Sequence, residues 1–186
     1  MKKDRIFLDQ QDYKNFLYRA KVLLGLLPPP KRTKKGGIKL TVLPSNAIEV
    51  LSYCLMPNHF HFLIKQREVD SVKKFFHRLS TSYATYFNKK YDKVGHIFQG
   101  IYKAKNILND SYLTHVSAYI HLNPAKPFEW EYSSLPEYMG QRSDSFVSTQ
   151  MLTDMNRFKP ESYKNFLLSQ FKPSILEEAD LLFDDD

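Results

Sequence analysis

The feature that most restricts the fold is the turn signal Met56-Pro57-Asn58, which stands between two apolar segments. Residues 48–55 and 59–65 are rich in β-branched, leucine and aromatic side chains. Two such runs around a short turn predict an antiparallel β-hairpin. Any fold that this chain adopts must therefore contain a sheet.

The second predicted strand carries a histidine–aromatic–histidine pattern. Successive side chains of a strand point to opposite faces, so His59 and His61 should share one face. Phe60, Phe62 and Ile64 should occupy the other face.

Three other segments have the apolar spacing of amphipathic helices. The first begins at Asp9 or Asp12 and runs to about residue 24. The others cover residues 69–89 and about 110–122, where Pro124 follows and ends the helix. Helices and a hairpin in this order predict an α+β fold. We expect residues 1–140 to form the domain, and residues 141–186 to form a loop-rich helical tail with an acidic, disordered end.

The charge of the chain is unevenly distributed. The chain of 186 residues has a formal net charge of +7, but its last ten residues hold six acids and no Lys or Arg. The remaining 176 residues therefore carry 27 basic and 14 acidic side chains, a net charge of +13. This excess of basic side chains favours a polyanionic partner, although a solvated basic surface would have the same composition.

Cysteine content and hydropathy indicate the compartment. Cys54 is the one cysteine, which excludes an internal disulfide and fits a reducing environment. The residues after Met1 contain no signal-peptide pattern, and the sequence has no run of about 18 apolar residues. We expect a cytoplasmic protein without a membrane partner.

The histidine pair is a candidate metal site. Two neutral imidazoles at positions i and i+2 of a strand, His59 and His61, can bind one ion from the same side. A pair of half-buried or surface histidines without a metal is the alternative.

The helix at residues 110–122 supplies a candidate nucleophile. Tyr119 and Asn123 are four residues apart and share a helix face. A tyrosine hydroxyl can attack a phosphodiester, and the Asn123 amide oxygen is a candidate third metal ligand. Tyr119 could equally be a packing residue. Tyr112, two helical turns earlier, is the rival nucleophile.

Residues 65–105 hold ten Lys or Arg against three acids, with aromatic residues interleaved. Charge that follows a phosphate backbone, together with stacking rings, is how proteins hold single strands. A helix with a basic solvent face and an aromatic core face has the same pattern. The candidate DNA-binding residues are Lys73, Lys74, Arg78, Lys103 and Lys105.

Four blocks in order resemble the REP-associated tyrosine transposases, which are single-tyrosine HUH transposases of the insertion-sequence-200-like group. These blocks are Met56-Pro57-Asn58-His59-Phe60-His61, Gly95-His96-Ile97-Phe98-Gln99-Gly100, Tyr119-Ile120-His121-Leu122-Asn123-Pro124 and Trp130-Glu131-Tyr132-Ser133-Ser134.

The resemblance implies a ferredoxin-like antiparallel sheet with helices on one face. It implies that His59, His61 and Asn123 hold Mg²⁺ or Mn²⁺, and that Tyr119 forms a 5′-phosphotyrosine and releases a 3′-hydroxyl. The partner would be single-stranded or hairpin DNA, bound by a monomer or homodimer.

Two positions differ from the family pattern. The family has a first strand before the block that matches residues 6–13, and we expect this chain to lack it. Ile101 stands where the family usually has Arg. A non-catalytic or decayed nucleic-acid-binding module is therefore an alternative. A zinc hydrolase that uses Glu49 or Glu68 is another.

Overall fold

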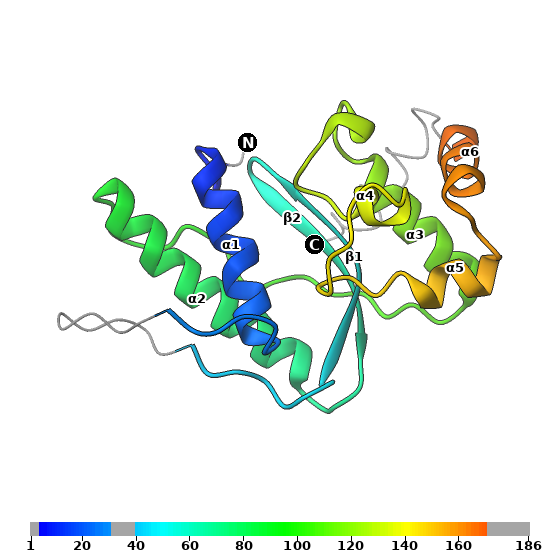
Figure 1. Ribbon diagram of the computed structural model, residues 1–186. Helices are drawn as coiled ribbons and strands as arrows, with labels where there is room; N and C mark the ends of the chain where they lie inside the picture. Colours follow the sequence, from blue (N-terminus) through cyan, green and yellow to red (C-terminus); the bar gives the residue numbers. More distant parts are fainter. Residues whose placement is uncertain (1–3, 31–39, 171–186) are drawn as a thin grey trace. The chain divides into compact units, whose positions relative to one another are not determined.

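The computed structural model describes residues 4–30 and 40–170. The elements labelled in Figure 1 are α1 (Gln10–Leu23), β1 (Ile48–Met56), β2 (His59–Gln66), α2 (Ser71–Tyr91), α3 (Asp110–Leu122), η1 (Pro127–Glu129), α4 (Leu135–Tyr138), α5 (Gln150–Asn156) and α6 (Pro160–Gln170). The predicted hairpin and the three predicted helices are confirmed to within two residues at either end, and so is the α+β class.

The sheet within the described residues consists of β1 and β2. The ferredoxin-like topology stays a prediction, as does the domain boundary at residue 140. The predicted acidic end falls in residues 171–186, outside the described part of the chain. In the described ranges no helix is long and apolar enough to cross a membrane.

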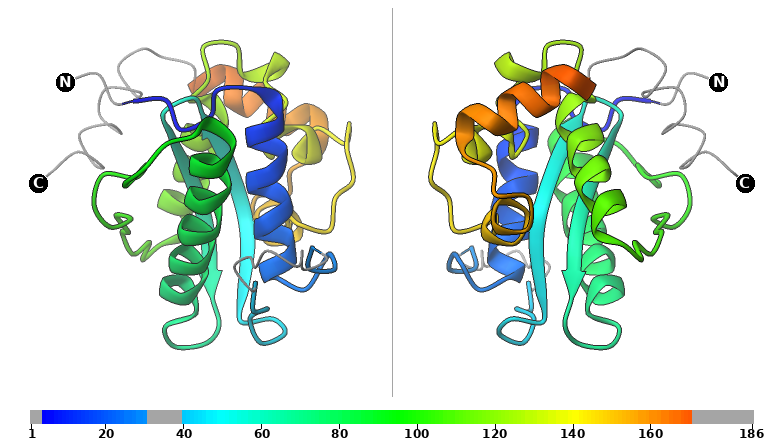
Figure 2. Two further views of the ribbon diagram at one scale, coloured as in Figure 1. Left: turned by 90° about the vertical axis from the view of Figure 1, so that its left-hand side faces the viewer. Right: turned by 90° about the vertical axis from the view of Figure 1, so that its right-hand side faces the viewer.

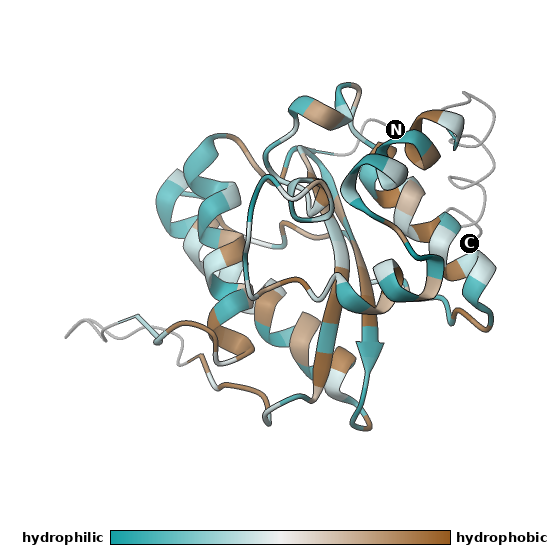
Figure 3. Ribbon diagram, turned by 45° about the vertical axis from the view of Figure 1, so that its right-hand side comes forward, coloured by the Kyte–Doolittle hydropathy of each residue, from teal (hydrophilic) through white to brown (hydrophobic). Residues whose placement is uncertain are grey.

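The chain divides into two compact units, and the hairpin contributes residues to both. Among the described residues, the first unit comprises 4–30, 40–49, 57–59 and 65–102. The second comprises 50–56, 60–64 and 103–170. The polar end of β2, which belongs to the first unit, is the teal arrowhead in Figure 3.

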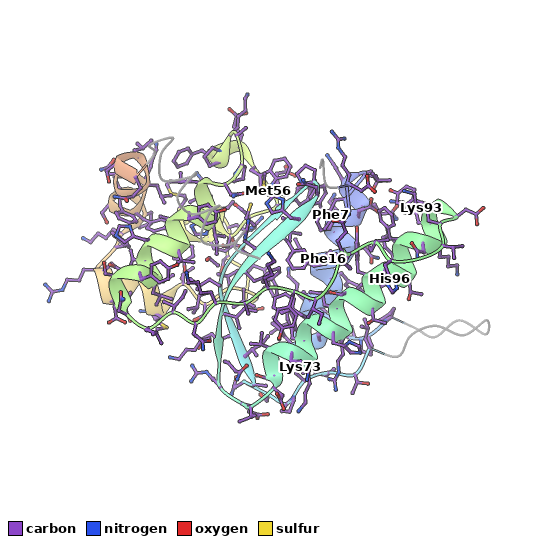
Figure 4. The ribbon with its side chains drawn as sticks, turned by 180° about the vertical axis from the view of Figure 1, so that it is seen from behind. Phe7, Phe16, Met56, Lys73, Lys93 and His96 are labelled. Atoms are coloured by element: carbon purple, nitrogen blue, oxygen red, sulfur yellow. The ribbon has the colours of Figure 1, made fainter. Side chains whose placement is uncertain are left out.

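The first unit is built on the packing of α1 against α2, which lie side by side in Figures 1 and 2. Phe7 and Phe16 form an aromatic cluster with Tyr83 of α2, with ring centroids 5.1–5.5 Å apart. Figure 4 marks the two phenylalanines beside α1. All three side chains are buried, so this cluster is the core of the unit.

A buried carboxylate joins α1 to α2 next to that core. The carboxylate of Asp12 accepts hydrogen bonds from Lys90 Nζ at 2.8 Å, from the Tyr91 hydroxyl at 2.8 Å and from the Tyr86 hydroxyl at 3.1 Å. It also closes the capping box of α1 with Asp9. Burial by itself raises the pKa of Asp12, but the bond from Lys90 and the other donors outweigh it and hold this pKa below its usual value.

The residues after α2 fold back along that helix. The Asn88 side chain donates to the Gly95 carbonyl at 2.8 Å, the Phe98 ring lies 6.2 Å from Tyr83, and the Tyr102 ring lies 4.9 Å from Phe76. Figure 4 shows Lys93 just beyond the end of α2 and His96 on the returning segment. The Phe98 and Tyr102 rings therefore pack on α2, as the core-face alternative predicts.

We predict that Asp12→Asn lowers the free energy of unfolding by about 2–4 kcal/mol at pH 7, because a buried charge-assisted partner of Lys90 is lost. Because the pKa of Asp12 is lower in the folded protein, the unfolded chain takes up a proton at a higher pH than the folded protein does. The stabilising contribution of Asp12 is therefore present above pH 4 and is lost as the pH falls below it. Urea unfolding at pH 7 and pH 3.5 measures both effects.

Asp9→Asn is the matched control, since Asp9 also binds Lys90 at 2.7 Å but its side chain is half exposed. Asparagine can still cap α1. We expect this variant to lose much less stability than Asp12→Asn, because solvent screens the exposed pair. Equal losses in the two variants would contradict the role assigned to Asp12.

Candidate active site

The two histidines of the predicted metal site lie on β2 and are half-buried. His59 Nδ1 lies 2.8 Å from the Asn58 side-chain oxygen. His61 contacts a ring of α3, whereas Phe62 stacks on Tyr53 of β1 with centroids 5.8 Å apart. His61 and Phe62 thus pack against different elements, in accord with the alternation that the sequence predicts.

Tyr119 of α3 is the ring that His61 contacts. The two ring centroids are 5.5 Å apart and the planes meet at 71°, an edge-to-face arrangement. Tyr119 is 4% exposed. Folding of the second unit therefore places the predicted nucleophile against a predicted metal ligand that is 58 residues away in the sequence.

Asn123 follows α3 directly as its C-cap residue, and its φ of −58° and ψ of −37° are still helical. Because helical geometry continues through this residue, Asn123 stays on the same helical face as Tyr119, one turn later. The Asn123 side chain is half-buried, and its role as a third metal ligand stays a prediction.

Buried hydrogen bonds hold α3 in place within the second unit. His121 is fully buried, and its Nε2 lies 2.7 Å from Ser134 Oγ. Its Nδ1 lies 2.7 Å from the hydroxyl of Tyr163 in α6, which also lies 3.2 Å from Ser117 Oγ. Burial lowers the pKa of His121 to about 3, so the ring is neutral and both of its nitrogens bond to hydroxyl groups.

A second attachment joins the start of α3 to α5. Thr114 Oγ1 accepts a hydrogen bond from the Asn156 side chain at 2.9 Å. With the bonds of His121, this attachment holds α3 at both its start and its end. The rotation of α3 about its own axis is thereby fixed, and with it the face that carries Tyr119.

Sequence reasoning missed Ser134 and Tyr163 as supports of the site. Ser134 lies in the block that resembles the family's tail, but nothing in the local pattern connects it to His121. Tyr163 lies in the stretch predicted only as a helical tail. His121 inside an apolar helix was the one available signal, because a buried histidine needs hydrogen-bonding partners.

The segment before α4 lies along the edge of β1. Leu55 N donates to the Tyr132 carbonyl oxygen at 2.8 Å, Ser134 N donates to the Tyr53 carbonyl oxygen at 3.0 Å, and Cys54 and Ser133 form an antiparallel bridge. The Trp130 indole donates to the Leu55 carbonyl oxygen at 3.0 Å. Residues 130–134 thus join β1 to the histidine that holds α3.

The rival tyrosine lies in a different setting. Tyr112 is in the first turn of α3, where its backbone N–H donates to the side chain of the N-cap Asn109 at 2.8 Å. It is half-buried, whereas Tyr119 is buried beside His61. Of the two, Tyr119 has the ring contact with a candidate metal ligand.

The candidate DNA-binding residues fall into both units. Lys73 and Lys74 are exposed on α2 in the first unit, and Lys103 and Lys105 are exposed before α3 in the second. The guanidinium of Arg78 donates to the backbone carbonyl oxygens of residues 41 and 42, at 2.8 and 3.3 Å. Arg78 therefore holds the chain before β1, a role that its sequence pattern did not indicate.

Over residues 4–30 and 40–170, no group of three or more His, Cys, Asp or Glu side chains is arranged to hold a metal ion. The set predicted from the sequence is of another kind, with two imidazoles and one amide. Glu49, which the zinc-hydrolase alternative would use, forms an ion pair with Arg67.

We predict that Tyr119→Phe folds like the parent protein, because the ring that packs against His61 is kept. Its free energy of unfolding should change by less than about 1.5 kcal/mol. Tyr119→Ala should lose about 3–5 kcal/mol, because a buried ring leaves a cavity. Urea unfolding followed by circular dichroism measures both losses, and a large loss in Tyr119→Phe would contradict the packing described above.

Comparison with family models identified a match to this chain. The model of a family described as "Transposase IS200 like" matches residues 30–123, about half of the chain. No curated protein and no solved structure matches. The matched range contains the hairpin, α2 and α3, and with them His59, His61, Tyr119 and Asn123.

Proposed function

The chain belongs to the family of IS200-like transposases, and we propose that it nicks and rejoins single-stranded DNA through Tyr119. DNA transposition is the function of the family. The observation that carries the finer proposal is the contact between the Tyr119 and His61 rings, 5.5 Å apart. A tyrosine used only for packing has no need of a candidate metal ligand beside it.

The donors on the chain suit Mg²⁺ or Mn²⁺. His59 and His61 would each offer a ring nitrogen, and Asn123 would offer its amide oxygen. All three donors are neutral, so the charge of the ion remains available for the oxygens of a bound phosphate. When bound, the ion would polarise the phosphoryl oxygens and stabilise the charge that develops on them.

The reaction follows from the chemistry of a phenol and a phosphodiester. The Tyr119 oxygen loses its proton and forms a bond to phosphorus, while the bond between phosphorus and the 3′ oxygen breaks. The products are a 5′-phosphotyrosine and a free 3′-hydroxyl, which takes up a proton. A 3′-hydroxyl of a second strand reverses the step and gives strand transfer. One phosphodiester-type bond replaces another, so no ATP is needed.

The burial of Tyr119 contributes to this role. A phenol has an ordinary pKa near ~10, so its hydroxyl is a weak nucleophile until its proton is removed. The Tyr119 ring packs against His61 of β2, so few rotamers are open to it and little entropy would be lost on attack. The bonds of His121 and Thr114 keep α3 in that position.

The test is a covalent-adduct assay. A labelled DNA hairpin with a single-stranded flank is incubated with the protein and Mn²⁺, then separated under denaturing conditions. We expect an adduct with the parent protein, no adduct with Tyr119→Phe, and no adduct when EDTA removes the metal.

Tyr112→Phe is the matched control, because it removes a hydroxyl from the same helix and should leave the adduct in place. An adduct that persists in Tyr119→Phe and disappears in Tyr112→Phe would transfer the role to Tyr112. DNA binding without any adduct would support the non-catalytic binding module instead.

The exposed lysines of α2 are proposed to contact the DNA backbone. Each phosphate contact that is lost should lower the slope of log K against log salt by about 0.7 for a single strand. We expect Lys73→Ala and Lys74→Ala each to show this change without loss of stability. Lys14→Ala, an exposed lysine on α1, is the control. Fluorescence anisotropy between 50 and 300 mM salt measures the slopes, and equal slopes in all variants would exclude this surface.

A further inference from the structure

We propose that Asn58 is a positioning residue that holds His59 in one tautomer, with the proton on Nδ1 and the lone pair on Nε2. This inference deepens the proposed function and rests on it, since it concerns one of the histidines assigned to the metal. Asn58 lies in the turn and is neither one of the candidate metal ligands (His59, His61 and Asn123) nor the candidate nucleophile Tyr119.

The first observation is the hydrogen bond itself. His59 Nδ1 lies 2.8 Å from Asn58 Oδ1. An amide oxygen only accepts hydrogen bonds, so this contact is a hydrogen bond only in the tautomer with the proton on Nδ1. A neutral imidazole carries a single N–H, which leaves the lone pair on Nε2. Histidines that bind metals commonly donate their other N–H to an oxygen in this way, which fixes both the tautomer and the ring orientation.

The second observation is that the turn carrying Asn58 is anchored. The backbone N–H groups of Ile6 and Phe7 both donate to the Pro57 carbonyl oxygen, at 2.8 and 3.1 Å. The Tyr83 hydroxyl in turn donates to the Ile6 carbonyl oxygen at 2.6 Å. All of these residues belong to the first unit, so the turn is tied to the core of that unit.

These bonds connect the α1–α2 core to the histidine. Ile6, Phe7 and Tyr83 are buried, and their backbone and hydroxyl groups hold Pro57. Asn58 follows Pro57 directly, so its side chain starts from a fixed backbone. The amide therefore meets the imidazole of His59 in a defined geometry, and the ring loses rotational freedom before any ligand binds.

The third observation is that the backbone of the turn does not require asparagine. The non-glycine residues with positive φ in the described ranges are Asn46, Asp70, Asp92 and Arg157. Asn58 is not among them, so an alanine at this position adopts the same backbone without strain. Replacing Asn58 therefore tests its side chain and leaves the turn intact.

The experiment compares Asn58→Ala with Asn58→Asp. Long-range proton–nitrogen NMR spectra of metal-free, ¹⁵N-labelled protein report which nitrogen of His59 carries the proton. We expect the Nδ1–H tautomer in the parent protein and in Asn58→Asp, which keeps an acceptor oxygen, and a mixture of tautomers in Asn58→Ala. Asn165→Ala, an exposed residue of α6, is the control. The His59 signals are assigned by their loss in His59→Gln.

A metal titration provides the second readout. Mn²⁺ affinity, followed by water-proton relaxation, should fall about 10- to 100-fold in Asn58→Ala, as for other residues that orient metal-binding histidines. The unfolding midpoint of Asn58→Ala should match that of the parent, which separates positioning from a loss of stability.

The possible outcomes separate the two proposals. An Nε2–H tautomer in the parent protein, or an Asn58→Ala variant that keeps both tautomer and Mn²⁺ affinity, overturns the role of Asn58 and leaves the proposed function standing. A parent protein that binds no Mn²⁺ overturns the metal part of the proposed function, and with it the purpose of positioning His59.

Discussion

The structure depends on one constraint, which is that the buried strand β1 must have its backbone groups hydrogen-bonded. Seven of its nine residues are buried. One edge of the strand pairs with β2, and the other receives bonds from residues 132–134 and from Ser148 N, which donates to the Val50 carbonyl oxygen at 2.9 Å. Segments about 80 to 100 residues downstream thereby bond to the hairpin that carries the histidines.

The hydrogen bonds between residues 132–134 and β1 also set the position of α3. Ser134 bonds to both backbone groups of Tyr53 in β1 and, through its hydroxyl, to His121. A neutral, fully buried imidazole between two hydroxyls is a rigid connection, because each donor and acceptor would lose a hydrogen bond if the helix rotated. The contact between His61 and Tyr119 is the consequence at the candidate site. Ser134 and Tyr163 therefore hold the helix that carries Tyr119.

The first unit has a different means of support. Its core consists of rings from α1, α2 and residues 6–7, and the Asp12 carboxylate satisfies donors from α2 beside that core. Ile6 and Phe7 extend this support to the hairpin turn through the Pro57 carbonyl oxygen. Packing also explains most of the aromatic residues between 65 and 105, which the sequence left open between base stacking and core formation. Tyr83 and Phe87 are buried, and Phe98 and Tyr102 lie on α2.

The sequence by itself determined the elements and the candidate chemistry. Periodicity, caps and turn residues act over a few positions, so α1, α2, α3 and the hairpin were predictable, as was the pairing of Tyr119 with Asn123 on one helix face. Only the tertiary structure decided that Tyr119 meets His61, that Ser134 and Tyr163 hold His121, and that Arg78 binds the backbone at residues 41 and 42. These contacts join residues 13 to 58 positions apart. They form because buried polar groups and rings need partners, and a local sequence pattern does not say which distant residue will satisfy them.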